Sequence, residues 1–278
     1  MKTWRRLAIP YLIWGTCMLL LPMLLIVFYS VIQPGNEVTT FRFTLANYIR
    51  FFTDPDFLLI LWRSLTIAVE TTAICLLIGY PIAYWISRCS KKTQNLMVLA
   101  ITLPMWINML VRTYAWIGIL SKGGPVSIVL SWFGIQDAEI LYTQAAVLIG
   151  MVYNYLPYMI LQIHSSLTKM DPSLEEAASD LGASPFQTFW RVTFPLSIPG
   201  VISGITLVFL PAISAFFIPK LLGGGWFLIG NVIENQFITV GEWNFGSAIS
   251  VIMAMIMMLL MSLVRKADRK ASQKEKNA

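Results

Sequence analysis

The sequence predicts an all-α polytopic membrane protein with six transmembrane helices. Composition is the first reason: of 278 residues, 57% are hydrophobic and only 12% are charged, which is not typical of a soluble domain. The second reason is that apolar runs of about 20 residues, the length that crosses a bilayer, recur along the chain. The segments between these runs are too short for a soluble core, so residues 1–278 are expected to form one transmembrane domain. The expected spans are residues 7–32, 64–86, 96–120, 143–164, 196–219 and 245–264.

The distribution of basic residues predicts the orientation of the spans. Most of the 20 Lys and Arg residues lie before the first span, after the second and fourth spans, and in a basic tail at 265–278. Cytoplasmic loops carry an excess of Lys and Arg, so both termini are expected in the cytoplasm. A flank that faces anionic lipid explains the basic tail better than nucleic acid does, and no nucleic-acid partner is expected.

The longest polar passage before this tail runs over residues 171–195, between the fourth and fifth spans. Its residues predict a short helix that begins at Asp171, or at Ser173 if Ser173 and Glu176 form a capping box. Gly182 is expected to end this helix, because glycine adopts the left-handed conformation at low cost.

A second short helix is expected directly after this bend. Ser184, Pro185 and Gln187 have the spacing of an N-cap, a first helical residue and a capping-box partner. Pro195 is expected to close the helix. A polar surface held rigidly at a membrane face predicts a docking surface for another protein.

The spacing of this passage resembles the EAA loop of ABC importer permeases, whose pattern is E-A-A, three residues, G, nine residues and I-x-L-P. The pattern is matched by Glu176, Ala177, Ala178, Gly182 and Pro195, with Val192 and Phe194 in place of I and L. In that family this segment, here called the coupling loop (residues 171–195), fits a groove on the cytoplasmic ATPase. The resemblance implies that the ATPase-coupling residues are Glu175, Glu176, Ala177, Ala178, Gly182, Ala183 and Pro195.

The resemblance extends over nearly the whole chain and is strongest over residues 103–116, 175–200 and 221–250. Within the family the chain is most similar to the first of the two permease subunits of spermidine/putrescine importers. This implies a type I importer fold, alternating access, and the cytoplasmic (inner) membrane of a bacterium. It also implies three partners: a second, homologous permease, a homodimeric ATP-binding subunit, and an extracytoplasmic polyamine-binding protein.

The chain itself is expected to be neither an enzyme nor a holder of a cofactor or metal. It has no G-x-x-x-x-G-K-[ST] motif to cradle phosphate, and one His cannot supply a metal cluster based on His. ATP and Mg²⁺ are therefore expected on the partner ATPase.

Polar and aromatic residues within the spans are candidates for lining a path for a cationic polyamine, because carboxylates and aromatic faces both attract cations. They are Glu70, Trp106, Asn108, Tyr114, Tyr153, Asn154, Tyr155 and, in the glycine-rich segment after span five, Glu234. The two glutamates are chosen by residue type and depth, not by the resemblance. Glu70 could instead pair with Arg63 or Arg112, and Asn154 could join two helices.

Two alternative functions remain open from the sequence. The first is an ABC permease for another small solute, such as ferric iron, thiamine or an organophosphonate. The second is a self-sufficient secondary transporter, which usually has inverted repeats. No such repeat is evident, and the coupling loop would have no purpose there.

Overall fold

The structure is a computed structural model that describes residues 2–33, 42–135 and 139–276. Within these ranges the chain is helical, and β-structure is limited to an isolated bridge between Ile32 and Phe43. Five helices are long and apolar enough to cross a membrane, and a bent helix pair makes a sixth candidate span. The prediction of an all-α membrane protein is thus confirmed. The five helices are Ile13–Ser30, Pro55–Ser87, Gln144–Leu167, Pro185–Ile213 and Trp243–Lys266.

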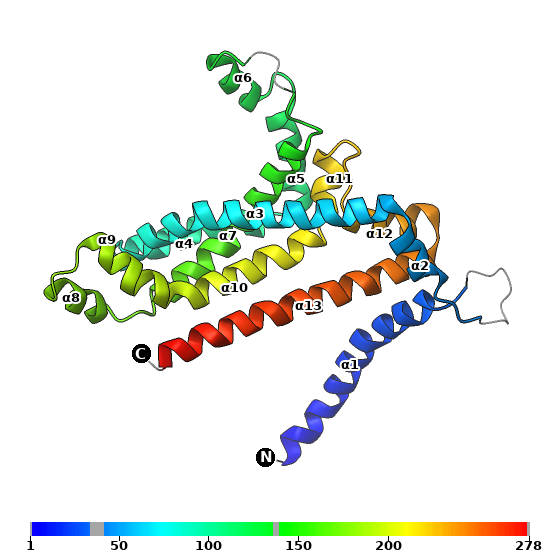
Figure 1. Ribbon diagram of the computed structural model, residues 1–278, viewed down its shortest axis with the longest axis horizontal. Helices are drawn as coiled ribbons and strands as arrows, with labels where there is room; N and C mark the ends of the chain where they lie inside the picture. Colours follow the sequence, from blue (N-terminus) through cyan, green and yellow to red (C-terminus); the bar gives the residue numbers. More distant parts are fainter. Residues whose placement is uncertain (1, 34–41, 136–138, 277–278) are drawn as a thin grey trace. The chain divides into compact units, whose positions relative to one another are not determined.

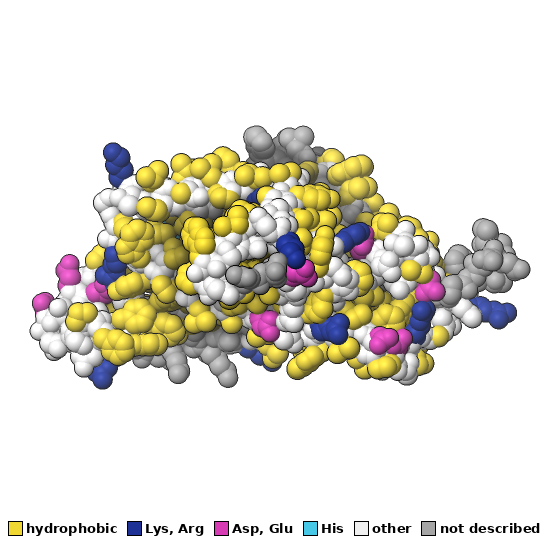
Figure 2. Space-filling model, turned by 90° about the horizontal axis from the view of Figure 1, so that it is seen from above, with side chains coloured by type: hydrophobic (Ala, Val, Ile, Leu, Met, Phe, Trp, Pro, Cys, Tyr) yellow, Lys and Arg dark blue, Asp and Glu magenta, His cyan; other side chains and the backbone are white. Residues whose placement is uncertain are grey.

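The surface agrees with a membrane location. Figure 2 shows one face on which hydrophobic side chains predominate and charged side chains are few and scattered. Nearly all side chains of Ile13–Ser30 in α1 (Lys2–Ser30) are exposed. A contiguous apolar surface of this kind needs lipid or another protein to cover it.

The third expected span, 96–120, is not one continuous helix. It consists of α4 (Lys91–Trp106) and α5 (Met109–Leu120), and the bent pair turns by 92° at the break. Ile107 has an extended backbone, and the Asn108 side chain accepts a hydrogen bond of 2.8 Å from the Leu110 N–H. Asn108 therefore caps a new helix at a point where the sequence predicted that the span would continue.

The chain divides into two compact units, which are described separately. The first comprises Met1–Leu59 with Val232–Met258, and the second comprises Ile60–Asn231 with Leu259–Ala278. Residues 277–278 of the expected basic tail lie outside the described residues. The coupling loop lies in the second unit.

In the first unit an ion pair joins α2 to the residue just before α13. The helices of this unit include α1, α2 (Ala46–Thr53), the π-helix η2 (Gln236–Val240) and the beginning of α13 (Trp243–Lys276). Arg50 Nη1 lies 2.8 Å from Glu242 Oε2, and the Arg50 guanidinium stacks 4.1 Å above the Phe245 ring. Asn244 Nδ2 donates to the Ile32 carbonyl at 2.9 Å and so connects α13 to the end of α1.

The second unit is built on α3 (Pro55–Ser87), α7 (Gln144–Leu167) and α10 (Phe194–Ile213) (Figure 1). Small residues, Gly200 and Gly204 in the spacing Gly-x-x-x-Gly, allow α7 and α10 to approach closely. A Cβ at Gly200 would lie 2.4 Å from the Ser166 Cβ, and one at Gly204 would lie 2.6 Å from the Met159 Sδ.

The Gly200→Ala substitution is expected to destabilise the protein by about 1–3 kcal/mol, because the added methyl group forces α7 and α10 apart. Gly118→Ala in α5 is the matched control, since nothing lies within 4 Å of its Cβ position. Thermal unfolding in detergent measures both. Equal melting temperatures for the two variants would show that the helices do not pack closely at Gly200.

The segment after α10 folds back onto the second unit. The fifth expected span reaches residue 219, but α10 ends at Ile213 and is followed by α11 (Phe217–Leu222) and α12 (Ile229–Asn235). Leu228 and Ile229 are fully buried, and the Ile229 N–H donates to Ser64 Oγ at 2.8 Å. Protein therefore covers the backbone here, as a non-helical segment at membrane depth requires.

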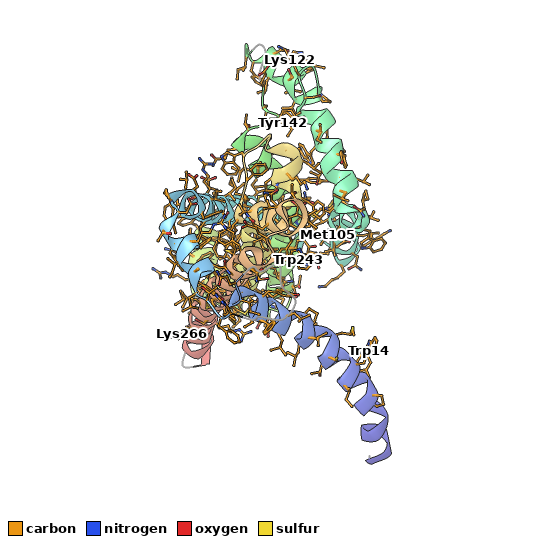
Figure 3. All side chains as sticks on the ribbon, turned by 90° about the vertical axis from the view of Figure 1, so that its right-hand side faces the viewer. Trp14, Met105, Lys122, Tyr142, Trp243 and Lys266 are labelled. Carbon is orange, nitrogen blue, oxygen red and sulfur yellow. The ribbon has the colours of Figure 1, made fainter. Side chains whose placement is uncertain are left out.

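An arm made of α5 and α6 (Pro125–Trp132) projects from this unit. Figure 3 shows Lys122 toward the far end of the arm and Tyr142 nearer to α11. The Tyr142 N–H donates to the Leu222 carbonyl at 3.0 Å, in a backbone conformation with φ of 68°. The approach of Tyr142 requires glycine at position 224, because a Cβ on Gly224 would lie 2.4 Å from the Tyr142 Cβ and would clash with it.

Candidate functional site

The coupling loop forms two short α-helices and a π-helix that continues into α10, at one end of the second unit (Figure 1). They are α8 (Ser173–Asp180), α9 (Pro185–Thr188) and η1 (Phe189–Thr193). The first helix begins at Ser173, after Pro172 in helical conformation, and no side-chain cap is formed at Pro172. Asp171, one of the two predicted starts, lies just before this point. Its Oδ1 accepts a hydrogen bond of 3.0 Å from the Ser173 N–H, and this bond lowers the pKa of the Asp171 carboxyl.

Gly182 ends α8 with the hydrogen-bond pattern of a Schellman motif. Its φ is +82°, its N–H donates to the Ser179 carbonyl at 2.9 Å, and the Ala183 N–H donates to the Ala178 carbonyl at 3.1 Å. Nothing lies within 4 Å of the position that a Cβ of Gly182 would take. The requirement for glycine is therefore conformational and not steric, which confirms the predicted left-handed bend.

Gly182→Val is expected to weaken the bend by about 1–2 kcal/mol, because a β-branched residue is strained at positive φ. Gly182→Asn is the matched control, since Asn adopts this conformation most readily after Gly. Limited proteolysis at the loop, which detects local opening, is expected to cut the Val variant faster than the Asn variant. Equal cutting rates would contradict the conformational requirement.

The second helix begins as predicted but does not end as predicted. Ser184 Oγ accepts from the Gln187 N–H at 3.3 Å, and Gln187 Oε1 accepts from the Ser184 N–H at 3.0 Å, which completes the capping box. Pro195 does not close the helix. It lies in the first turn of α10, where its missing N–H is tolerated, and the helix continues through it. Just before it, the Phe194 N–H donates to the Phe189 carbonyl, the i to i−5 hydrogen bond of a π-helix.

The inner side of the coupling loop contains an ion pair. Arg88, just after α3, binds both carboxylate oxygens of Glu175, and Thr193 Oγ1 donates to Glu175 Oε1 at 2.7 Å. Burial alone would raise the pKa of Glu175, but these two hydrogen bonds and the Arg88 charge outweigh it and lower the pKa. The contribution of the Glu175 carboxylate to the stability of the folded protein is thus fully present above the ordinary glutamate pKa of about 4.3. This contribution is lost as the pH falls through the lower pKa that Glu175 has in the folded protein.

Aromatic rings pack the loop against α3. The Phe189 ring centroid lies 5.8 Å from that of Tyr80 and 5.4 Å from that of Tyr84, both in edge-to-face geometry. Phe194 lies 5.7 Å from Tyr80. Tyr80 also bonds α10 through its hydroxyl, which is 2.8 Å from Ser197 Oγ. The π-helix η1 is thereby fixed to α3 by side-chain packing.

The outer side of the coupling loop is apolar and unusually exposed. Leu181 is 90% exposed, Phe186 is 73% exposed and Trp190 is 50% exposed. Among the predicted coupling residues, Glu176 and Ala177 are exposed on α8, whereas Ala178, Ala183 and Glu175 are half-buried. The coupling residues therefore divide into an outer set that another protein can reach and an inner set that anchors the loop.

The structure gives Glu70 a hydrogen bond and no ion pair. Gln144 Nε2 donates to Glu70 Oε2 at 3.4 Å. The predicted alternative was a salt bridge from Glu70 to Arg63 or Arg112. The structure describes all three of these side chains and forms no salt bridge between them. The Glu70 carboxylate is half-buried within α3, in an apolar helix where an unpaired charge is costly.

The aromatic candidates differ in exposure. Trp106 and Tyr114 are 77% and 59% exposed on either side of the α4–α5 break. Tyr153 is 37% exposed, and its ring lies 5.2 Å from that of Trp116. These three side chains are accessible on the surface of this single chain, where a solute or a second chain could reach them.

The remaining candidates make contacts within the chain. Asn154 is 4% exposed and donates to the Gly150 carbonyl at 2.8 Å, and Tyr155 is 9% exposed and donates to the Pro211 carbonyl at 3.3 Å. Gly150 lies in α7 itself, so this Asn154 hydrogen bond stays within one helix, whereas the Tyr155 hydrogen bond connects α7 to α10. Asn108 is the cap of α5. Glu234 lies in α12, at a position that belongs to the first unit.

A cavity of about 450 Å³ opens beside the coupling loop, between the ends of α7 and α10. Its lining includes Ser165, Ser166, Lys169 and Asp171. None of the eight pathway candidates contributes to it, so the candidates and this cavity are separate features.

The sequence of the chain is similar to that of a family of known proteins. The chain matches the binding-protein-dependent transport system inner membrane component over residues 75–273, which is more than half of its length. The chain belongs to this family. The permease is 41% identical to the spermidine/putrescine transport system permease protein PotB of Haemophilus influenzae over 86% of the chain and 84% of that protein. It is 39% identical to PotB of Escherichia coli over 87% of the chain and 89% of that protein.

The fold of the permease is that of an ABC importer. It is similar to a chain in the crystal structure of a bacterial ABC transporter that imports the acidic polysaccharide alginate, with a TM-score of 0.77 over 97% of the permease and 96% of that chain. The two chains share 18% sequence identity, so this likeness concerns the fold alone. The predicted type I importer permease fold is confirmed.

Proposed function

We propose that this permease is one of two homologous membrane subunits of an ATP-driven importer that carries spermidine or putrescine into the cytoplasm. An extracytoplasmic binding protein delivers the polyamine, and a homodimeric ATP-binding subunit holds ATP and Mg²⁺ and hydrolyses the nucleotide. The permease has both termini in the cytoplasm of a bacterium. It is not itself an enzyme and binds no cofactor.

The observation that carries the choice of substrate is the identity with PotB over 84–89% of the length of the two relatives. Identity of 39–41% over nearly the full length includes the spans and not only the coupling loop. This favours a polyamine over ferric iron, thiamine or an organophosphonate.

The geometry of the coupling loop supports an external source of energy. Leu181, Phe186 and Trp190 form an apolar outer surface that the described residues leave largely exposed, and Glu176 lies exposed at the start of α8. Apolar side chains surrounded by polar residues are typical of protein interfaces. A self-sufficient secondary transporter would have no use for this surface.

The exposed candidates support a passage formed between two chains. Trp106, Tyr114 and Tyr153 offer aromatic faces for cation–π contact, and Glu70 offers a carboxylate that forms no ion pair with any described residue. We assign no direct contact with the solute to the other four candidates, which are Asn108, Asn154, Tyr155 and Glu234. Weak contacts suit a passage, because a solute must leave it as readily as it enters.

Reconstitution of all four kinds of subunit in proteoliposomes tests the proposal. We expect ATP-dependent uptake of labelled spermidine that excess unlabelled spermidine or putrescine suppresses and that thiamine does not. Uptake that a different solute suppresses would replace the polyamine with that solute. Uptake that persists without the ATP-binding subunit would instead favour a secondary transporter.

A further inference from the structure

Glu175 points away from the surface that the ATPase is proposed to bind. Its side chain is 14% exposed, whereas its neighbour Glu176 is exposed. Both oxygens of the Glu175 carboxylate are occupied by Arg88, with Nη1 on Oε2 and Nη2 on Oε1. A two-point contact of this kind fixes the relative orientation of the two groups as well as their distance.

The contact joins three segments that are far apart in the sequence. Arg88 follows the last turn of α3, Glu175 lies in the first turn of α8, and Thr193 is the last residue of η1. Thr193 is 1% exposed and donates to the same carboxylate at 2.7 Å. We call Arg88, Glu175 and Thr193 the α3 clamp.

The surroundings of the α3 clamp restrict bending at this point. The Arg88 guanidinium lies 4.9 Å above the Tyr84 ring, and the Phe189 ring packs against the same tyrosine at 5.4 Å. Charge, ring stacking and hydrogen bonding thus hold α8 and η1 to one end of α3. Packed contacts of this kind can carry a displacement of α8 to α3, whereas a flexible loop would absorb it.

We propose that the α3 clamp is the contact through which movement of the coupling loop reaches α3, with Arg88 as its positioning residue. The inference rests on the proposed function, because it concerns how an ATP-driven importer uses this loop. It assigns Glu175 an inward role, distinct from docking, and adds Arg88 and Thr193 to the coupling machinery. The Glu70 carboxylate lies on the same helix, α3, so this movement also reaches a candidate pathway residue.

The test is the coupling ratio, the number of solute molecules imported per ATP hydrolysed, in proteoliposomes that contain the complete importer. Arg88→Glu and Glu175→Arg are each expected to lower this ratio at least fivefold while the ATPase stays bound, because the outer surface is intact. The double exchange is expected to restore the ratio to within twofold of the unmodified protein. Arg88→Lys is expected to give an intermediate ratio, since Lys keeps the charge but lacks the two-point geometry.

Lys92→Glu is the matched control, because Lys92 is an exposed basic residue in the same inner segment. Its ratio is expected to remain unchanged. Single exchanges with an unchanged ratio, or a double exchange without recovery, would overturn the proposal. If a single exchange fails to assemble, Thr193→Val decides, with an expected loss of about twofold if the clamp acts and none if it does not. An unmodified importer that consumes ATP without importing any solute would refute the proposed function itself.

Discussion

Leu181→Asp is expected to lower the affinity of the permease for its ATPase by about 100-fold, and uptake is expected to fall accordingly. Central apolar side chains at interfaces contribute about 2–4 kcal/mol, and 2.7 kcal/mol corresponds to this factor. Aspartate also places an unpaired charge in a groove that is expected to be apolar. Binding of the purified ATPase to the permease in nanodiscs measures the effect directly.

The exposure of Leu181 makes this experiment clean. Because Leu181 is 90% exposed, its replacement removes little packing within the permease, and the melting temperature is expected to stay nearly unchanged while the affinity for the ATPase falls. Leu181→Met should bind normally, since it conserves apolar volume. Phe133→Asp changes a side chain that is 79% exposed outside the coupling loop and should also bind normally. Unchanged affinity for Leu181→Asp would remove the outer surface from the docking interface.

Local signals in the sequence predicted local structure. The left-handed bend at Gly182 and the capping box of Ser184 and Gln187 depend on residues within one turn of each other, and both form as expected. Apolar runs likewise predicted the long helices, because crossing a bilayer leaves a composition that few other structures share. Each of these predictions needs only the residues of one segment.

The sequence did not reveal which face of α8 is directed inward. Glu175 and Glu176 are adjacent and chemically alike, yet one binds Arg88, which lies 87 residues earlier, and the other is exposed. Only the three-dimensional arrangement of α3 distinguishes them. A basic residue just after a span predicts orientation in the membrane, and that explanation is sufficient without any ion pair.

The break in the third span was missed for a similar reason. Asn108 was interpreted as a polar group inside a continuous span, but its side chain caps α5 at Leu110. Asn is favoured both at helix caps and at polar contacts between membrane helices, so residue type alone does not separate the two roles. Tyr153, Asn154 and Tyr155 show a further limit, because successive residues on a helix point in directions about 100° apart and cannot share one face.

Glu70→Gln is expected to reduce polyamine uptake about 30-fold while ATPase binding is unchanged. Glu70 is half-buried, its hydrogen bond comes from a neutral amide, Gln144, and it forms no ion pair with a described residue, so a cationic solute would supply a charged partner. Loss of one member of a partly buried charge pair costs about 2 kcal/mol or more, which corresponds to this factor. Gln keeps the size of the side chain and its ability to accept from Gln144, so the substitution tests charge and not packing.

The matched control for Glu70 is Glu139→Gln, which removes the same charge from an exposed position outside the spans. Glu139 is 76% exposed at its side chain and lies 3.9 Å from Lys122, so its removal should leave uptake nearly unchanged. Initial rates over a range of spermidine concentrations separate a weaker passage from a defect in assembly. A Glu70→Gln importer that transports at the unmodified rate would exclude Glu70 from the pathway, and Gln144 would then be a partner that satisfies the carboxylate structurally. If Trp106→Ala also leaves uptake unchanged, the passage does not run along the exposed sides of α3 and α4.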